Sequence, residues 1–376
     1  MKKTFLFTDW CHVHKGQLEA TFDPDRLSEW GKEAIERNKR AWGIYPDLSG
    51  HGMKRTRLPH GVKIGIEKAK KSAPWLVADQ PWESTINWLT VLHEEGRFRC
   101  WYESFLPKED AGTVHQVFDT EREMKVGGSV LCYAESEDGV HWKKPSLNIC
   151  SFRGATDNNI VSPYGNSTAV FRDDSAPAAE QYKCFHWSEL ADASENDTAG
   201  SKYGLYGAVS EDGYRWTLLP DPLFRYFHDT QNVACWDPDT KKYIAYLRGH
   251  FGGRAISRSE TDDFRHWPAA EILLCPGAQD EPSADYYTNG FTWYPGDPSL
   301  KFFFCAIYHH HSDLVDVRLA VSHDGKAFNW VSQDPIIEIG NPGAWDSGSI
   351  YACPNLVHLP DGGLALPYHG SEMTHN

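Results

Sequence analysis

The seven-residue phrase Ser-x-Asp-Gly-x-x-aromatic recurs along this chain and constrains its fold more than any other feature of the sequence. Its copies occupy residues 136–142, 210–216, 261–267 and 322–328, and the third copy has Thr261 in place of Ser and Phe264 in place of Gly. Repeats spaced by roughly 50 to 75 residues are typical of stacked or closed repeat architectures. We therefore expect successive copies of one structural unit.

The chemistry of the phrase is that of a β-hairpin turn. Each copy follows a strand-like apolar run, such as residues 129–134 or 205–209. Asp-Gly suits the left-handed backbone of a tight turn, and the aromatic residue that opens the next strand can anchor it against its neighbour. We interpret the phrase as the turn between the third and fourth strands of a four-stranded blade. The aspartates inside it are then structural: Asp138, Asp212, Asp263 and Asp324.

The remaining strand patterns predict an all-β, five-bladed β-propeller over residues 76–376. Inner strands are expected at residues 86–91, 167–171, 228–236, 285–291 and 345–351. The last blade ends near residues 364–368 and lacks two strands, so either an N-terminal strand at residues 4–7 completes it or the chain is a piece of a longer one. A helix-prone stretch at residues 25–37 lies in residues 1–75, which we expect to form a short helical decoration packed on the propeller.

The composition is that of a soluble globular protein, with 40% hydrophobic and 24% charged residues. A net charge of −15 argues against a nucleic-acid partner. No apolar run is long enough to cross a membrane, and Asp9 interrupts the apolar start, which we interpret as a strand rather than a signal peptide. The nine cysteines lack metal-type spacing, so we expect buried free thiols and a cytoplasmic location.

Five segments carry a resemblance to a known family. They are Pro-Trp-Glu at residues 81–83, the long phrase at residues 134–145, and residues 157–161, 228–232 and 345–348. With the blade pattern they resemble the five-bladed propeller glycosidases, the group that contains invertases, levansucrases and arabinanases, and in particular an uncharacterised invertase-like branch. The resemblance covers nearly the whole chain and implies glycosidase activity. The chain lacks the Asn-Asp-Pro-Asn-Gly, Arg-Asp-Pro and Glu-Cys motifs of invertases, so fructose-specific chemistry is not expected.

Inner strands of a propeller run in one direction, so the residues that open them converge on one mouth. These residues are Glu83, Asn166, Asp229, Asp285 and Asp346. A glycosidase needs one protonated and one ionised carboxyl, and clustered like charges separate their pKa values. The resemblance implies that Glu83 is the nucleophile or base and that Asp229 orients substrate or tunes a pKa. It leaves the acid open between Asp285 and Asp346, with Glu281 as a fallback.

Aromatic and polar residues near these acids are candidates for sugar binding, although tryptophans at blade starts also serve ordinary packing. Some flank the strand openings and others end the second strands, which return to the same face. The expected substrate-binding residues are Trp82, Asn166, His186, His228, Arg248, Tyr287, Asn289 and Trp345.

No cofactor or metal is expected. His309, His310 and His311 are metal-ligand residue types, but consecutive residues of a strand point to opposite faces and cannot all reach one ion. The resemblance to arabinanases leaves a structural ion on the propeller axis open.

These observations predict a glycoside hydrolase, exo-acting on short oligosaccharides, with a ring of carboxylates at the propeller mouth. Two alternatives stay open. A glycoside phosphorylase would need a basic cluster at the mouth, for which Arg248 and Arg254 are available. A non-catalytic glycan-binding propeller would keep the aromatics without a working acid pair. The sugar, the stereochemical outcome and the oligomeric state are not specified by the sequence.

Overall fold

The computed structural model describes residues 28–30, 33, 37, 65–118, 128–194, 202–226 and 228–376. The chain divides into two compact parts, residues 1–66 and residues 67–376. In the first part, Glu29, Trp30, Glu33 and Arg37 are helical and exposed, as expected for the helix-prone stretch. The strand predicted at residues 4–7 lies outside the described residues, and the packing of residues 1–75 on the propeller stays a prediction.

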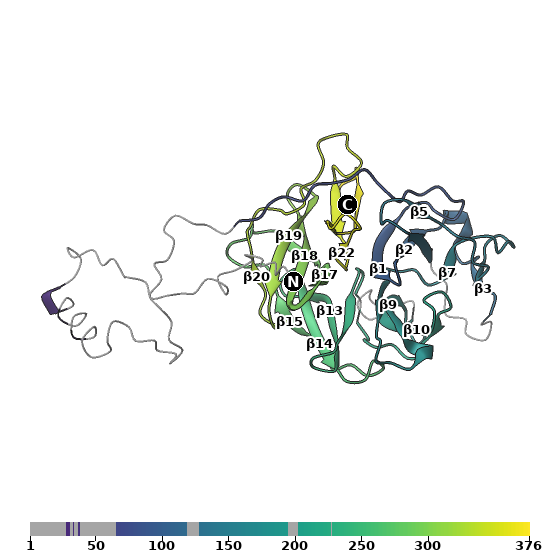
Figure 1. The fold of residues 1–376 in the computed structure, drawn as a ribbon, viewed down its shortest axis with the longest axis horizontal. Helices are drawn as coiled ribbons and strands as arrows, with labels where there is room; N and C mark the ends of the chain where they lie inside the picture. The colour runs from purple at the N-terminus through teal and green to yellow at the C-terminus, as the bar shows by residue number, and fades with distance from the viewer. Residues whose placement is uncertain are drawn as a thin grey trace. The chain divides into compact units, whose positions relative to one another are not determined.

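The second part is built from successive groups of mainly antiparallel strands, which we call units and number in chain order (Figure 1). The first contains β1 (Asn87–Glu94), β2 (Arg97–Phe105), β4 (Ser129–Ser136) and β5 (Trp142–Lys143), with β7 (Ile160–Ser162) beside β4. The second contains β8 (Ala169–Arg172), β9 (Tyr182–Glu189), β10 (Tyr203–Ser210) and β11 (Thr217–Leu218). The third contains β12 (Val233–Asp237), β13 (Lys242–His250), β14 (Arg254–Thr261) and β15 (Glu271–Leu274).

The last two units have inner strands in two pieces. In the fourth, β16 (Ala284–Thr288) and β17 (Phe291–Tyr294) both pair with β18 (Asp297–His309), which β19 (Leu314–Ser322) and β20 (Asn329–Trp330) follow. In the fifth, β21 (Ser349–Ala352) pairs with β24 (Tyr368–Ser371), and β22 (Val357–His358) pairs with β23 (Leu364–Ala365), which makes one long hairpin. A parallel pairing of β19 with β21 joins these two units into one sheet. Smaller elements are the pair β3 (His115–Gln116) and β6 (Cys150–Ser151), and the 3-10 turns η2 (Lys108–Asp110) and η3 (Ala178–Glu180).

These sheets succeed one another around a ring, from blue through teal and green to yellow in Figure 1. The prediction of an all-β propeller is therefore confirmed, and strands β1, β8, β12, β16 and β21 overlap the predicted inner-strand ranges. The blade count of five stays a prediction, because the fifth unit contains a single hairpin in the described part of the chain.

The turn phrases share one hydrogen-bond pattern, which explains their recurrence. In the first, Ser136 Oγ accepts from the Gly139 amide at 2.9 Å, and Asp138 Oδ1 accepts from the amides of Val140 and His141 at 2.8 Å. Residues 210–216 and 322–328 repeat this pattern. The glycines have φ of 78°, 75° and 70°, a left-handed conformation that side chains disfavour. The phrase aspartates are structural, as predicted.

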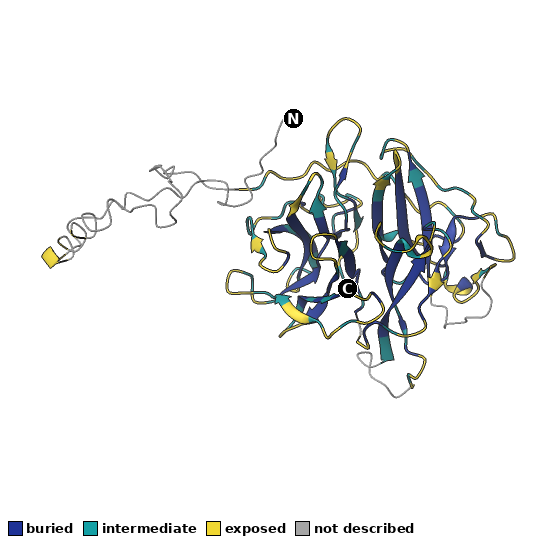
Figure 2. Cartoon of the chain, turned by 60° about the horizontal axis from the view of Figure 1, so that its bottom comes forward, coloured by how far each residue is buried: buried dark blue, intermediate teal, exposed yellow. Residues whose placement is uncertain are grey.

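Hydrophobic clusters lie between neighbouring sheets and hold the ring together. One joins the second and third sheets through Phe171, Phe185 and Tyr243. Another joins the third and fourth sheets through Tyr246 and Phe303. Figure 2 shows that the middle of the sheets is buried while exposed residues gather in the connections.

Buried polar bonds near the axis tie the inner strands to one another. Gln231, just before β12, donates its amide to the carbonyl of Leu89 at 3.1 Å and to that of Thr168 at 3.0 Å. The Val170 amide donates to Thr90 Oγ1 at 3.1 Å. One glutamine side chain thus joins the first three units.

The eight described cysteines are free, and all but Cys275 are buried, as expected from the sequence; Cys11 lies outside the described residues. The cytoplasmic location inferred from them stays a prediction. Over the described ranges, no helix has the length and apolar character needed to span a membrane.

Candidate functional site

Asp229 and Arg248 form an ion pair at the opening of the third inner strand. Asp229 precedes β12, and about a third of its side chain is exposed (33%), whereas that of Arg248, near the end of β13, is 2% exposed. Arg248 also donates to the Tyr287 carbonyl at 3.2 Å, and its guanidinium lies 4.1 Å from the centre of the Tyr287 ring. Tyr287 belongs to the fourth inner strand, so this contact joins two units.

Asp285, on β16, forms an ion pair with Arg254, the next arginine after Arg248. Its carboxylate accepts from the Arg254 amide at 2.8 Å, from the Arg254 guanidinium at 2.7 Å and from His310 Nε2 at 2.9 Å. Burial by itself would raise the pKa of Asp285, but the hydrogen bonds from Arg254 and His310 outweigh it and the pKa is lowered. Asp285 is therefore ionised near neutral pH. Arg254 also lies 5.1 Å from the Tyr287 ring centre.

Aromatic rings extend this arrangement to the fifth and first units. Tyr287 contacts Tyr351 at 5.4 Å and His375 at 4.7 Å between ring centres. Tyr351 in turn contacts Trp88 at 5.4 Å and His369 at 4.9 Å. Trp88 has φ of 41° beside an irregularity in the β1–β2 register, and such bulges near sites re-aim side chains.

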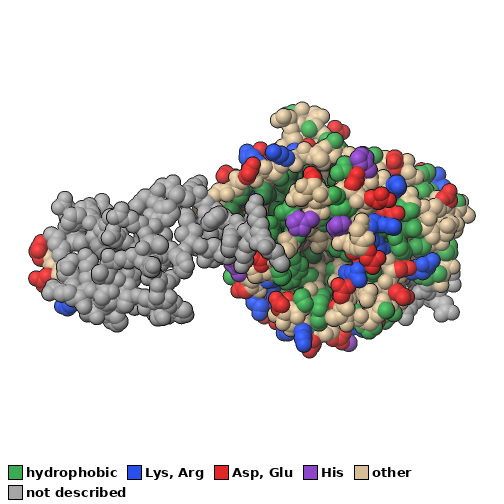
Figure 3. Space-filling view, in the orientation of Figure 1, with side chains coloured by type: hydrophobic (Ala, Val, Ile, Leu, Met, Phe, Trp, Pro, Cys, Tyr) green, Lys and Arg blue, Asp and Glu red, His purple; other side chains and the backbone are tan. Residues whose placement is uncertain are grey.

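We call this contiguous set the mouth cluster, because it is centred on Asp229 and Asp285 at the openings of the third and fourth inner strands. It consists of Trp88, Asp229, Arg248, Arg254, Asp285, Tyr287, His310, Tyr351, His369 and His375. Figure 3 shows histidine side chains near the centre of the face in view, beside a hollow lined by hydrophobic side chains. Of the predicted site residues, Asp229, Asp285, Arg248 and Tyr287 meet here.

Two further predicted residues lie directly behind the cluster. His228 is 3% exposed and its Nδ1 lies 3.0 Å from the Arg248 carbonyl, while its Nε2 has no partner. Burial lowers the pKa of His228 to about 4, so its ring is neutral. Asn289 donates to the Tyr246 carbonyl at 3.1 Å and accepts from the Phe291 amide at 2.9 Å, contacts that support the break between β16 and β17.

Glu83 and Trp82 belong to a separate network in the first unit. The Glu83 side chain has 0% exposure. It accepts from Lys144 Nζ and from the Tyr102 hydroxyl, both at 2.6 Å. Asn159 connects the two residues, since it donates to the Tyr102 hydroxyl at 2.7 Å and accepts from Trp82 Nε1 at 2.9 Å. The structure thus encloses Glu83, and its role as nucleophile or base stays a prediction.

Asn166 and His186 lie where the first and second units meet. Asn166 accepts from Ser129 Oγ at 2.5 Å and donates to the Trp187 carbonyl at 3.1 Å. The His186 ring is 1% exposed, is stacked on Tyr164 at 5.9 Å, and has neither nitrogen hydrogen-bonded. Burial lowers the pKa of His186 to about 4. No contact described above links either residue to the mouth cluster.

Asp346 and Trp345 lie in the fifth unit. Asp346 accepts from Lys71 Nζ at 2.7 Å and from the Tyr368 hydroxyl at 3.1 Å, and its side chain is 3% exposed. Trp345 is 38% exposed and stacks on the Tyr368 ring at 5.5 Å. The two residues border a groove beside the mouth cluster.

Glu103 is a carboxyl group to which the sequence analysis gives no role. It lies near the end of strand β2, opposite Asn87, the residue that precedes Trp88. Burial raises the pKa of Glu103 to about 7, although hydrogen bonding with Ser129 and with the Ser167 backbone acts in the opposite direction. Its Oε2 has no hydrogen-bond partner. Its position near the end of a second strand could have marked Glu103 as a site residue in the sequence. Its burial, in contrast, depends on the neighbouring unit and could not be predicted.

His309 ends strand β18, whereas His310 and His311 lie in the turn that follows it, and the three side chains do not share one partner. His309 and His311 pair with Glu281, the fallback acid, whereas His310 pairs with Asp285. His309 also lies 3.0 Å from Asp316. No group of three or more metal-ligand side chains among the described residues is arranged to hold an ion.

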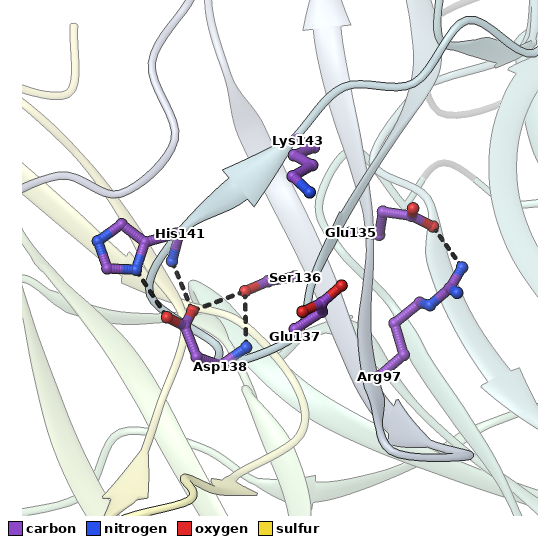
Figure 4. Close-up of a pocket in the computed structure, with 7 residues that line it drawn as sticks. All are labelled: Arg97, Glu135, Ser136, Glu137, Asp138, His141 and Lys143. Atoms are coloured by element: carbon purple, nitrogen blue, oxygen red, sulfur yellow. Dashed lines mark hydrogen bonds and ion pairs between the residues drawn. The ribbon is translucent and has the colours of Figure 1, made fainter.

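A small pocket of about 170 Å³ lies at the first turn phrase (Figure 4). Its lining includes Asp138, whose carboxylate is committed to His141 and to turn amides, and Glu135, which pairs with Arg97 at 2.9 Å. These groups stabilise the turn, and the pocket is not the candidate site.

No protein-family model matches the chain. The uncharacterized protein Rv1502 of Mycobacterium tuberculosis is 25% identical over 171 residues, which are 43% of this chain and 46% of that protein. The chain thus matches about half the length of this curated relative.

Several solved structures resemble the chain over most of its length. A glycosyl hydrolase from Bacteroides ovatus matches with a TM-score of 0.51 and 13% identity, covering 85% of this chain and 94% of that one. A structure from the GH130 family of mannoside phosphorylases, which contains glycoside hydrolases that target β-1,2 mannosidic linkages in Candida mannan, matches with a TM-score of 0.51 and 14% identity, covering 85% and 95%. At these identities the likeness shows a common fold, the β-propeller.

Proposed function

We propose that the chain is a glycoside hydrolase that removes a terminal sugar from short oligosaccharides. The observation that carries this proposal is the pairing of Asp229 with Arg248 and of Asp285 with Arg254 around one aromatic ring, that of Tyr287. Ionised carboxylates that can act as base or nucleophile, beside aromatic rings that can hold a sugar face, are what glycoside hydrolysis requires. The propeller fold shared with glycoside hydrolases supports the proposal.

The two aspartates suit different tasks. Asp229 is the more exposed and is the better placed to contact a substrate, whereas Asp285 is 7% exposed and is oriented by three hydrogen bonds. Neither suits the proton donor, because an adjacent guanidinium favours the ionised form of a carboxyl. Glu103, with a pKa of about 7, meets the requirement for a group protonated near neutrality, and it lies on β2 opposite Asn87, the residue before Trp88. We assign it the acid role as part of the proposal.

Phosphorolysis is the second candidate, favoured by the two arginines and the histidines of the mouth cluster. Bound phosphate would replace the catalytic base and would need uncompensated positive charge. Each guanidinium already faces a carboxylate, however, and His375 has its pKa lowered by burial and by Arg254. The charge balance therefore favours hydrolysis.

A non-catalytic glycan-binding propeller is the third candidate. The observation in its favour is that the acids of the mouth cluster, Asp229 and Asp285, both pair with arginines. If Glu103 does not donate a proton, the mouth cluster would bind a sugar without cleaving it.

One screen separates the three candidates. The purified chain is incubated with aryl glycosides of common hexoses and pentoses, and with di- and trisaccharides from plant, algal and fungal glycans, β-1,2-linked mannosides included, with and without phosphate. We expect phosphate-independent sugar release that Asp229→Asn abolishes at a temperature where circular dichroism shows the variant to be folded. Asp221→Asn, which changes an exposed carboxylate, is the matched control and should keep its activity.

Release only with phosphate would establish phosphorolysis, and binding without release would establish the glycan-binding alternative. If Asp229→Asn retains wild-type turnover, the site assignment is wrong. The stereochemistry of the first product, followed by proton NMR, then distinguishes inversion from retention.

A further inference from the structure

A groove lies between the first and fifth units, beside the mouth cluster. Residues 72–78 form one wall, Trp345 and residues 368–372 form the other, and Ile86 and Leu89 of the first unit complete the lining. Its volume is about 530 Å³, within the range of small-molecule sites. The groove is therefore large enough for a ligand of the size of a sugar.

One wall of the groove is a fixed aromatic platform. Trp345 and Tyr368 stack at 5.5 Å with 23° between their planes, and Trp345 is nevertheless 38% exposed. A Cβ on Gly370 would come within 2.9 Å of the Trp345 ring and 2.7 Å of Asp346 Cβ, so only glycine lets the ring lie this close to β24. An exposed aromatic ring that is held flat against the backbone is preorganised for stacking.

The opposite wall carries a second tryptophan. Trp75 stacks on Trp142 at 4.4 Å with 25° between their planes, which fixes its position in residues 72–78. Two aromatic side chains, one on each wall, suit a ligand with flat apolar faces.

The polar side chains that line the groove are those of Ser72, Tyr368, His369, Ser371 and Glu372. The carboxylate of Asp346, next to Trp345, is paired with Lys71 and with the Tyr368 hydroxyl and so adds no free charge. The serine hydroxyls and the exposed carboxylate of Glu372 can exchange hydrogen bonds with the hydroxyl groups of a sugar. The lining therefore combines aromatic rings with hydrogen-bonding groups that suit a polyol.

The groove adjoins the mouth cluster through His369. The His369 ring lies 4.6 Å from Trp88 and 4.9 Å from Tyr351, both members of the cluster, while His369 also lines the groove. The groove and the mouth cluster therefore share residue 369 and lie next to each other.

We propose that this groove is a second sugar-binding subsite, which holds a ring of an oligosaccharide whose terminal sugar occupies the mouth cluster. The inference deepens the proposed function and rests on it. It implies that substrates of two or more sugar residues are preferred, because a single sugar at the mouth leaves the Trp345 platform empty.

The test compares Trp345→Ala and Trp345→Phe with the wild type, using the same glycan panel. Kd is measured by tryptophan fluorescence and by ligand-observed NMR, and KM and kcat are measured for every member that is cleaved. Trp345→Ala should weaken trisaccharide binding about tenfold, through loss of one stacking contact. For aryl monosaccharide glycosides, Kd and KM of Trp345→Ala should stay within about twofold of the wild-type values. Trp345→Phe should restore much of the lost trisaccharide affinity.

Trp293→Ala is the matched control, since Trp293 is a partly buried tryptophan that lines a different pocket, near the opposite ends of the inner strands. The groove assignment fails alone if trisaccharide binding is unchanged in Trp345→Ala, or if Trp293→Ala weakens it equally. If the wild type binds trisaccharides without cleaving them, the hydrolase proposal fails while the subsite is still tested through Kd. Binding to no member of the panel overturns both.

Discussion

The buried carboxyl of Glu103 should make the stability of the chain depend on pH. A glutamate ordinarily has a pKa of 4.5, and burial raises that of Glu103 to about 7. Between these values the folded chain keeps a proton that the unfolded chain has released. Stability from this group is therefore fully present below about pH 4.5 and is lost as the pH rises through 7.

The size of the effect follows from the two pKa values. Each pH unit between 4.5 and about 7 corresponds to about 1.4 kcal/mol, so the loss approaches about 3 kcal/mol at pH 8. Glu103→Gln keeps the shape of the protonated side chain and has no charge to bury. We expect the free energy of unfolding of the variant, relative to wild type, to rise by about 3 kcal/mol between pH 4.5 and pH 8.

The assay is urea unfolding of both proteins at half-unit pH steps, followed by tryptophan fluorescence. Buried histidines such as His186 and His228 also titrate, but they are common to both proteins and cancel in the difference. Glu137→Gln, at an exposed position, should follow the wild-type pH profile. A difference between Glu103→Gln and wild type that stays constant across the pH range would refute the reasoning.

Two further substitutions test the structural networks. Lys144→Met should destabilise the fold by about 3–5 kcal/mol, because it leaves the enclosed carboxylate of Glu83 without its cation. Adding Glu83→Gln should recover much of this loss, as measured by urea unfolding. An equal loss in the single and double variants would contradict this. Asp212→Ala should lower stability by about 1–2 kcal/mol, because the hydrogen bonds to the Tyr214 and Arg215 amides are lost. The folded variant should keep the wild-type kcat. A lower kcat in the fully folded variant would indicate a direct role of Asp212 in catalysis.

The fold could be predicted from the sequence because the hydrogen bonds that specify its turns are local. The side chains and amides of a turn phrase bond to one another within four residues, so Ser136, Asp138 and Gly139 specify the hairpin without help from distant parts of the chain. The strand order then follows from repetition. The convergence of Asp229 and Asp285 was predictable for the same reason, since both residues open inner strands.

The rest of the site depends on contacts that no local pattern encodes. Glu83 also opens a strand, but Lys144 and Tyr102 enclose it, and Lys144 is 61 residues away. Asp346 is paired with Lys71, from a segment with no strand pattern. Trp88 enters the mouth cluster through a register irregularity, and His375 enters it from beyond the last strand. Such orientations are set by tertiary packing.

The hydrogen bonds of Gln231 affect how the propeller unfolds. Gln231, just before the third inner strand, donates hydrogen bonds to a carbonyl of the first unit and to one of the second. Separating any of these units therefore breaks a buried hydrogen bond. Modular repeats often unfold piecewise, each at its own free energy. Here we expect one side chain to couple the opening of three of them, and Asp229, two residues before the glutamine, belongs to this coupled region.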